Sequence, residues 1–193
     1  MIIIASGLSG TGKSVLCEKL ARYFRLRYVP ASGIYKKVRE EKLSEMHIGQ
    51  LKKNVGWWES AEGQRFMEKR LKDPKFDRAV DNTLLRMIEK GNVATDSWTM
   101  PWLSKKGFKI WLKASDGVRG ERLAKRDRSK NKRQLLKIIR QKEKRTKKIY
   151  KKLYGFDFAK DFSPFDLIID TDALDKQQVF EIAKKAIEKK SGM

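Results

Sequence analysis

A glycine-rich segment near the start of the chain has the spacing of a phosphate-binding loop. Residues 7–14 read Gly-Leu-Ser-Gly-Thr-Gly-Lys-Ser, which matches the pattern G-x-x-x-x-G-K-[ST] at every position. Glycines let backbone N–H groups converge on phosphate oxygens, and the start of the following helix adds its positive dipole end. The predicted phosphate contacts come from Gly7, Ser9, Gly10, Thr11, Gly12, Lys13 and Ser14.

Three side chains extend this prediction to a triphosphate and a metal ion. In such loops the lysine, here Lys13, reaches the β- and γ-phosphates, and the hydroxyl of Ser14 ligates Mg²⁺. Asp96 follows the apolar segment 92–95, at the strand end where ligands of open α/β sheets gather. We therefore predict Ser14 and Asp96 as metal ligands, with a turn-capping role as the alternative for Asp96.

These residues must be positioned by an alternation of strands and helices. Short apolar segments predict strands over 2–5, 26–29, 92–95, 108–112 and 166–170. Helical spacing of apolar residues predicts helices over 14–24, 33–45, 57–70, 76–90, 119–128, 132–153 and 173–189. Strands that alternate with helices indicate an α/β fold whose parallel sheet is covered on both faces.

Composition excludes several other classes of protein. The 193 residues are 40% hydrophobic and 36% charged, which is too hydrophobic for a disordered chain. No apolar run approaches the ~18 residues that a membrane span needs, and Met1–Ala5 lacks the features of a signal peptide. A single cysteine and a single histidine leave no disulfide framework and no His/Cys metal cluster. We expect a monomeric, soluble, cytoplasmic protein.

The formal net charge of +22 favours polyanionic partners such as nucleotides or nucleic acids. Residues 119–152 alone hold 17 basic and 3 acidic side chains. Six of these basic residues form one predicted helical stripe: Arg133, Lys137, Arg140, Lys144, Lys148 and Lys151. The stripe is either a solvated outer face or a surface that contacts the backbone of RNA or DNA.

From residue 1 to about residue 189, the chain resembles the archaeal type of cytidylate kinase, within the nucleoside monophosphate kinases. Besides the phosphate loop, the resemblance depends on residues 31–36 and on Asp73–Asp81, which reads Asp-Pro-Lys-Phe-Asp-Arg-Ala-Val-Asp. Gly91–Val93 and Lys109–Ala114 are also similar. The most discriminating segments are the late ones, Tyr-Gly-Phe-Asp at 154–157 and Asp-Leu-Ile-Ile-Asp-Thr at 166–171.

The resemblance implies a single P-loop kinase-like domain and a reaction. The expected fold is a five-stranded parallel sheet of order 2-3-1-4-5, with its core in residues 1–32, 91–118 and 164–190. A helical insert over 33–90 would bind the nucleoside monophosphate, and residues 119–163 would form a basic lid. ATP with Mg²⁺ would donate its γ-phosphoryl group to a CMP- or dCMP-like acceptor.

The resemblance also implies roles for single residues. Lys36 stands where the family usually has an arginine that grips the acceptor phosphate, so it keeps the charge without the bidentate fork. Lid arginines Arg122 and Arg126, with Arg119 on the same face, would neutralise the transferring phosphoryl group. The remaining implied contacts are Asp77, Asp81 and Arg140 to the acceptor, further support from Arg145, and Thr171 with Asp172 at the adenine pocket.

One position departs from the family pattern. After the third strand the family reads Glu-Gly-Arg, and that arginine clamps the acceptor phosphate, whereas this chain reads Asp96-Ser97-Trp98. Trp98 cannot pair with a phosphate, but it can stack on a base or fill the core. The departure keeps a second hypothesis open, in which the protein is a kinase-like P-loop ATPase that binds RNA through its basic lid.

Overall fold

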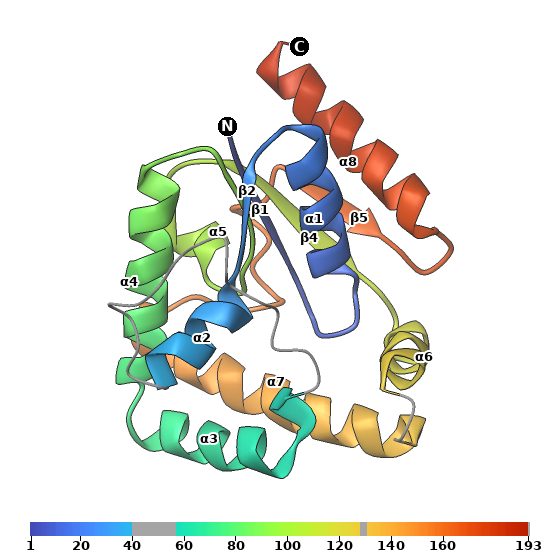
Figure 1. Cartoon of the computed structure of the whole chain (residues 1–193). Helices are drawn as coiled ribbons and strands as arrows, with labels where there is room; N and C mark the ends of the chain where they lie inside the picture. The colour runs from blue at the N-terminus through green and yellow to red at the C-terminus, as the bar shows by residue number, and fades with distance from the viewer. Residues whose placement is uncertain (40–56, 128–130, 193) are drawn as a thin grey trace.

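A parallel sheet forms the centre of the computed structural model, which describes residues 1–39, 57–127 and 131–192 (Figure 1). Within these ranges five strands form one sheet of order β2-β3-β1-β4-β5. The strands are β1 (Ile2–Gly7), β2 (Arg27–Pro30), β3 (Val93–Asp96), β4 (Phe108–Lys113) and β5 (Leu167–Asp170). The predicted α/β class and strand order are confirmed.

Helices connect the strands and cover both faces of the sheet (Figure 1). They are α1 (Lys13–Tyr23), α2 (Ala31–Arg39), the 3₁₀ turn η2 (Trp57–Glu59), α3 (Ala61–Lys72), α4 (Lys75–Glu89), α5 (Met100–Leu103), α6 (Asp116–Arg126), α7 (Lys132–Tyr154) and α8 (Lys176–Ser191). No helix among the described residues is long and apolar enough to cross a membrane.

The apolar core divides between the two faces of the sheet. Ile3 packs with residues of α1 and α8, including Leu20 and Ala183. The next residue along β1, Ile4, packs on the other face with residues of α2, α4 and α5, including Leu84. Successive side chains of a strand point to opposite faces, so β1 supplies both halves of the core. Its carboxyl end is thereby held between the two helical layers.

The helix predicted over 57–70 is present as α3, but it begins at Ala61, after the separate 3₁₀ turn η2. The Ser60 hydroxyl donates to the Trp57 carbonyl at 2.6 Å and accepts the Gly63 backbone N–H at 3.2 Å. Ser60 is therefore an N-cap that starts a new helix. The short helix α5 was not predicted. Residues 40–45 of the predicted helix 33–45, and residue 128, lie outside the described residues.

A buried ion pair ties α3 to α4. The Arg70 and Asp77 side chains are 3% and 0% exposed, and their charged groups are in direct contact. Tyr35 of α2 donates its hydroxyl to the same carboxylate at 2.7 Å. Charges taken out of water need such partners, so the pair fixes how α2, α3 and α4 pack together.

We predict that Asp77→Ala lowers the free energy of unfolding by about 3–5 kcal/mol, because it leaves the Arg70 guanidinium buried without its anion. The measurement is urea denaturation followed by circular dichroism. Asp73→Ala is the matched control, since Asp73 pairs with Lys75 at the surface and its side chain is 51% exposed. Exposed pairs contribute about 0–1 kcal/mol. Equal losses for the two variants would contradict the prediction.

Candidate active site

The turn between β1 and α1 has the backbone shape that a phosphate cradle requires. Gly12 is the N-cap of α1 and has φ 99°, in the left-handed region that favours glycine. Gly7 has φ 144°, and a Cβ atom there would collide with the Leu112 carbonyl oxygen of β4. The loop therefore turns sharply against β4 and exposes the N-terminal amides of α1, which is a ready-made anion site.

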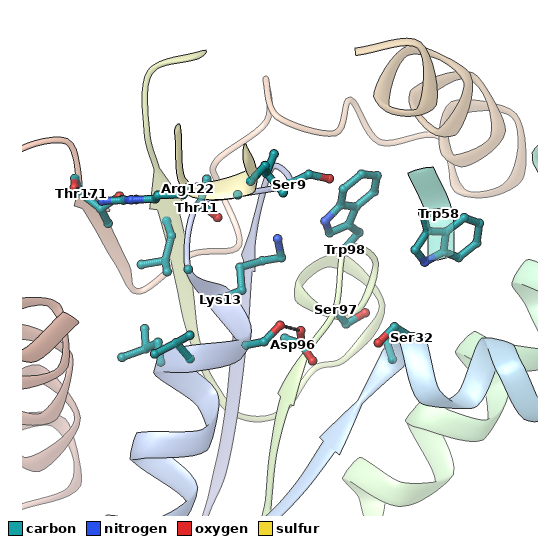
Figure 2. Close-up of a pocket in the computed structure, with 18 of the residues that line it drawn as sticks. Ser9, Thr11, Lys13, Ser32, Trp58, Asp96, Ser97, Trp98, Arg122 and Thr171 are labelled. Atoms are coloured by element: carbon teal, nitrogen blue, oxygen red, sulfur yellow. Dashed lines mark hydrogen bonds between the residues drawn. The ribbon is translucent and has the colours of Figure 1, made fainter. Parts of the chain in front are cut away.

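Lys13 begins α1 and points into this site (Figure 2). Its Nζ donates to the Leu8 carbonyl oxygen at 2.9 Å. Burial lowers the pKa of Lys13 to about 8; the nearby Asp96 carboxylate opposes this shift and the Lys142 ammonium adds to it. Lys13 is therefore a cation whose charge near neutral pH depends on its surroundings.

Ser14 and Asp96 come together although 82 residues separate them in the sequence. The Ser14 hydroxyl donates to the Asp96 carboxylate, as the dashed line in Figure 2 marks. Tyr28 of β2 donates its hydroxyl to the other carboxylate oxygen at 3.0 Å. A hydroxyl and a carboxylate side by side next to a phosphate loop are oxygen donors of the kind Mg²⁺ takes, so these residues fit the ion.

A large cavity of about 1090 Å³ opens in front of this loop. Its lining joins the phosphate loop to α6 and α7, the start of α8 and the helical segment between β2 and β3. Ser32 and Trp58 lie across the cavity from Arg122 and Thr171, with Lys13 and Asp96 between them (Figure 2). Pockets that bind one drug-sized ligand measure ~300–1,000 Å³, so this cavity is at the large end of ligand-binding sites.

The helices α6 and α7 are fastened to the phosphate loop through Ser9. The Ser9 backbone N–H donates to Glu143 at 3.0 Å, and the Ser9 carbonyl accepts from Arg119 Nε at 2.8 Å. Arg119 and Glu143 also form an ion pair, with side chains 2% and 7% exposed. Arg119 therefore joins the lid to the loop. Helical spacing predicts Arg119 on the same face as Arg122 and Arg126. Only Arg122 and Arg126 of these three line the cavity.

Arg122 and Arg126 both line the cavity, but Arg122 is already engaged at its far end. The Arg122 guanidinium donates to the Thr171 hydroxyl at 2.8 Å and to the Thr171 carbonyl at 2.7 Å. Thr171 follows β5 and is 1% exposed. This geometry places Arg122 beside the predicted adenine-pocket residue.

The two predicted acceptor carboxylates differ in position. Asp81 lines the cavity and accepts hydrogen bonds from Thr99 and from Tyr154, the latter at 2.7 Å. Burial raises the pKa of Asp81 to about 6, against the effect of these two donors. Asp77 is fully buried behind the cavity wall in its pair with Arg70. Lys36 lies in α2, and its side chain is outside the described part of the structure.

Arg140 is not brought to the cavity, which corrects its predicted contact with the acceptor. It lies on the outer face of α7 with its side chain 61% exposed, and its guanidinium pairs with Asp116. Arg145 likewise lies outside the cavity lining, and its Nη1 atom is 3.9 Å from Oε1 of Glu68. Helical spacing predicted that these arginines lie on α7, but the docking of the helix turns them away from the cavity.

Trp98 both packs and lines the cavity. Its ring stacks on Phe158 with centroids 4.8 Å apart, within an aromatic cluster that includes Trp102 and Trp111. The half-buried ring also forms part of the cavity wall. Trp98 therefore fills the core and also lines the cavity, while its stacking on a base stays a prediction.

Trp58, Arg70 and Lys142 are among the lining residues that sequence reasoning missed. A signal for Lys142 is present in the sequence of α7. Leu135, Ile139 and Ile149 are buried on one face of the helix, and position 142 falls on that same face by three- and four-residue steps. A lysine on an apolar helix face is unusual and marks a candidate for a functional cation.

Comparison with known proteins identifies the family. Residues 2–173 match the model of the cytidylate kinase-like family. The cytidylate kinase of Pyrococcus horikoshii is 33% identical over 189 residues, which cover 97% of this chain and 88% of that protein. The cytidylate kinase of Methanocaldococcus jannaschii is 31% identical over 193 residues, covering 97% of this chain and 98% of that protein.

Solved structures show the same fold at lower identity. The shikimate kinase of Bacteroides thetaiotaomicron superposes with a TM-score of 0.57 at 18% identity, covering 100% of this chain and 99% of that one. TT1252 from Thermus thermophilus has a TM-score of 0.58 at 15% identity, covering 98% and 97%. With the phosphate loop, the strand order and these matches in place, the chain belongs to the cytidylate kinase-like family and is an ATP-dependent phosphotransferase.

Proposed function

We propose that this protein is a nucleoside monophosphate kinase, which transfers the γ-phosphoryl group of ATP, held with Mg²⁺, to CMP or dCMP. The observation that carries the proposal is the single continuous cavity, whose lining joins the phosphate loop to α2, η2 and α4. A donor at the loop and an acceptor against those helices would meet near Lys13. The choice of a cytidine acceptor is supported by the names of the relatives.

Catalysis in this proposal is positioning and charge neutralisation. The loop amides and Lys13 hold the donor phosphates, while Arg126 and Arg122 bring positive charge from the lid. Ser14 and Asp96 would hold Mg²⁺, and the bound ion would supply positive charge that neutralises the phosphates. Covering by α6 and α7 keeps water from competing with the acceptor. In this proposal the chain divides into three functional parts. They are a core of residues 1–32, 91–118 and 164–190, an acceptor-binding insert of residues 33–90 and a lid of residues 119–163.

RNA binding is the second candidate function, and the outer face of α7 favours it. Arg133, Lys137, Lys144 and Lys148 are all exposed along this face. Two further members of the predicted stripe, Arg140 and Lys151, pair with Asp116 and Asp157. The four remaining cations, from Arg133 to Lys148, cover 15 helical steps, or about 22 Å at ~1.5 Å per residue, which is long enough to follow several RNA phosphates.

We predict that Lys13→Ala reduces phosphoryl transfer to CMP roughly 100- to 1,000-fold, because it removes a cation aimed at the transferring group. Radiolabelled ATP is incubated with CMP, dCMP, UMP, AMP or GMP, and the diphosphates are separated and counted. CDP or dCDP is the expected main product of the unmodified protein. Lys90→Ala, at the exposed end of α4, is the control and retains activity. Absence of transfer to every monophosphate would contradict the proposed function.

We predict that affinity for ATP with Mg²⁺ falls as the pH rises through about 8. The pKa of Lys13 is lowered to about 8, so its attractive cationic form is present below that pH and is lost above it. The Kd, measured by calorimetry from pH 7 to pH 9.5, is expected to rise, approaching about tenfold per pH unit. In Lys13→Arg the charge persists, so the dependence flattens. A Kd that is independent of pH in the unmodified protein would argue against this role.

We predict that the triple variant Lys137→Glu, Lys144→Glu, Lys148→Glu loses RNA affinity and keeps CMP phosphorylation, because these side chains point away from the cavity. Binding of a fluorescent single-stranded RNA is measured by anisotropy from 50 to 300 mM KCl. Each lost phosphate contact lowers the slope of log affinity against log salt by about 0.7. RNA binding that is equally strong in the triple variant, or that is insensitive to salt, would count against the second candidate.

A further inference from the structure

The Asp96 carboxylate receives a hydrogen bond on each of its two oxygens. Ser14 of α1 donates to Oδ2, and the Tyr28 hydroxyl of β2 donates to Oδ1 at 3.0 Å. A phenol keeps its proton at neutral pH, so toward a carboxylate it is a donor. Two strands and a helix therefore meet at one carboxylate, and β2 contributes to the candidate metal site through Tyr28.

The pairing of β2 with β3 explains why Tyr28 reaches this carboxylate. In the parallel register Tyr28 lies opposite Ala94, and Pro30 lies opposite Asp96. Side chains two residues apart on a strand point to the same face, so Asp96 shares a face with Ala94. The two positions are about 6.6 Å apart along the strand at ~3.3 Å per residue, which a tyrosine side chain spans. The contact is thus built into the register of the sheet.

Packing fixes the direction of the Tyr28 hydroxyl. The half-buried ring packs against the core cluster that includes Leu16 and Leu20 of α1. Ser14 and Asp96 line the cavity, whereas Tyr28 lies outside its lining. The hydroxyl therefore acts on a ligand in the cavity through the side chains that it orients.

The Asp96 carboxylate is also attracted by a cation. The Lys13 ammonium is close enough for Asp96 to act on its pKa, so the two opposite charges attract each other. An aspartate at the end of a strand has several staggered rotamers, so a carboxylate held at one oxygen only would rotate more readily toward the lysine. The hydrogen bond from Tyr28 favours the rotamer in which Asp96 stands beside Ser14.

We propose that Tyr28 is a positioning residue, whose hydroxyl holds Asp96 beside Ser14 in the orientation that binds Mg²⁺ together with ATP. This role of Tyr28 rests on the part of the proposed function that assigns Mg²⁺ to Ser14 and Asp96, and it is independent of the acceptor. Groups that hydrogen-bond to a metal-binding carboxylate orient it, and their loss typically costs about 10- to 100-fold in metal affinity or activity.

The test is calorimetric titration of Tyr28→Phe with a non-hydrolysable ATP analogue, in excess Mg²⁺ and again in EDTA. The substitution removes the hydroxyl and keeps the ring that packs in the core. With Mg²⁺ the Kd is expected to rise roughly tenfold, because Asp96 is less well oriented for the ion. In EDTA the Kd is expected to change less than about twofold, since the loop amides and Lys13 are untouched.

Tyr23→Phe is the matched control. The Tyr23 hydroxyl donates to the Glu188 carboxylate at 2.8 Å, and Tyr23 is 51% exposed. The same kind of hydrogen bond is therefore lost at a surface outside the cavity lining. Both Kd values of this variant are expected to stay within about twofold of those of the unmodified protein.

A second variant tests whether Tyr28 acts through Asp96. Asp96→Asn keeps the shape of the side chain and removes its negative charge, so it weakens binding with Mg²⁺. Adding Tyr28→Phe to Asp96→Asn is expected to change the Kd with Mg²⁺ by less than about twofold, because the oriented carboxylate is already gone. A further rise of roughly tenfold in the double variant would overturn the proposed role.

The outcomes separate the role of Tyr28 from the function on which it rests. An unchanged Kd with Mg²⁺ in Tyr28→Phe, or an equal rise of the Kd with Mg²⁺ and in EDTA, would overturn the role of Tyr28 alone. Binding by the unmodified protein that is no tighter with Mg²⁺ than in EDTA would overturn the metal assignment, and with it the role of Tyr28.

Discussion

The turn from β1 into α1 is the constraint on which the rest of the site depends. Its positive-φ glycines allow the chain to reverse against β4, and the Cβ atom that glycine lacks at position 7 would collide with the Leu112 carbonyl. The same turn is also fixed by α6 and α7, because the Ser9 N–H donates to Glu143 and the Ser9 carbonyl accepts from Arg119. The positions of β1, α1 and the helices α6 and α7 therefore all depend on the backbone of this turn.

Positive charge is this chain's dominant property, and the structure assigns it three different tasks. Arg70 and Arg119 are buried with carboxylates and fasten helices together, so they contribute to packing. Lys13, Arg122, Arg126 and Lys142 line the cavity, where they supply positive charge. The outer face of α7 keeps a row of exposed cations that lie outside the lining of this cavity. A net charge alone does not distinguish among these tasks, because burial and partners decide them.

Aromatic packing explains how a tryptophan is accommodated at the end of β3. Trp98 stacks on Phe158, and the nearby Trp102 stacks on Phe156 with centroids 4.3 Å apart. Trp102 also donates its indole N–H to Asp161 at 2.8 Å, so its polar atom is satisfied. The segment that follows α7 thus supports one side of Trp98 and leaves the indole available to Lys142. A bulky residue at this position is built into the cavity wall.

The sequence by itself determined the features that local spacing encodes. The glycines and Lys13 of the loop, the alternation of strands and helices and the inward apolar face of α7 follow from periodicity within single elements. The family resemblance added the strand order. The loop, the elements and the apolar helix face depend on residues close together in the sequence, so they can be predicted from the sequence alone.

Only the tertiary structure decided which charged side chains face the cavity. Arg119, Arg140 and Lys142 all lie on two basic helices, yet one is buried, one points outward and one enters the site. The position of Arg119 depends on Ser9, 110 residues away in the sequence, and that of Lys142 on indole rings from η2 and from the segment after β3. Helical spacing defines a face of a helix, but the rotation with which that helix docks is set by contacts distant in sequence. Side-chain roles in the lid therefore emerge only when the chain is packed.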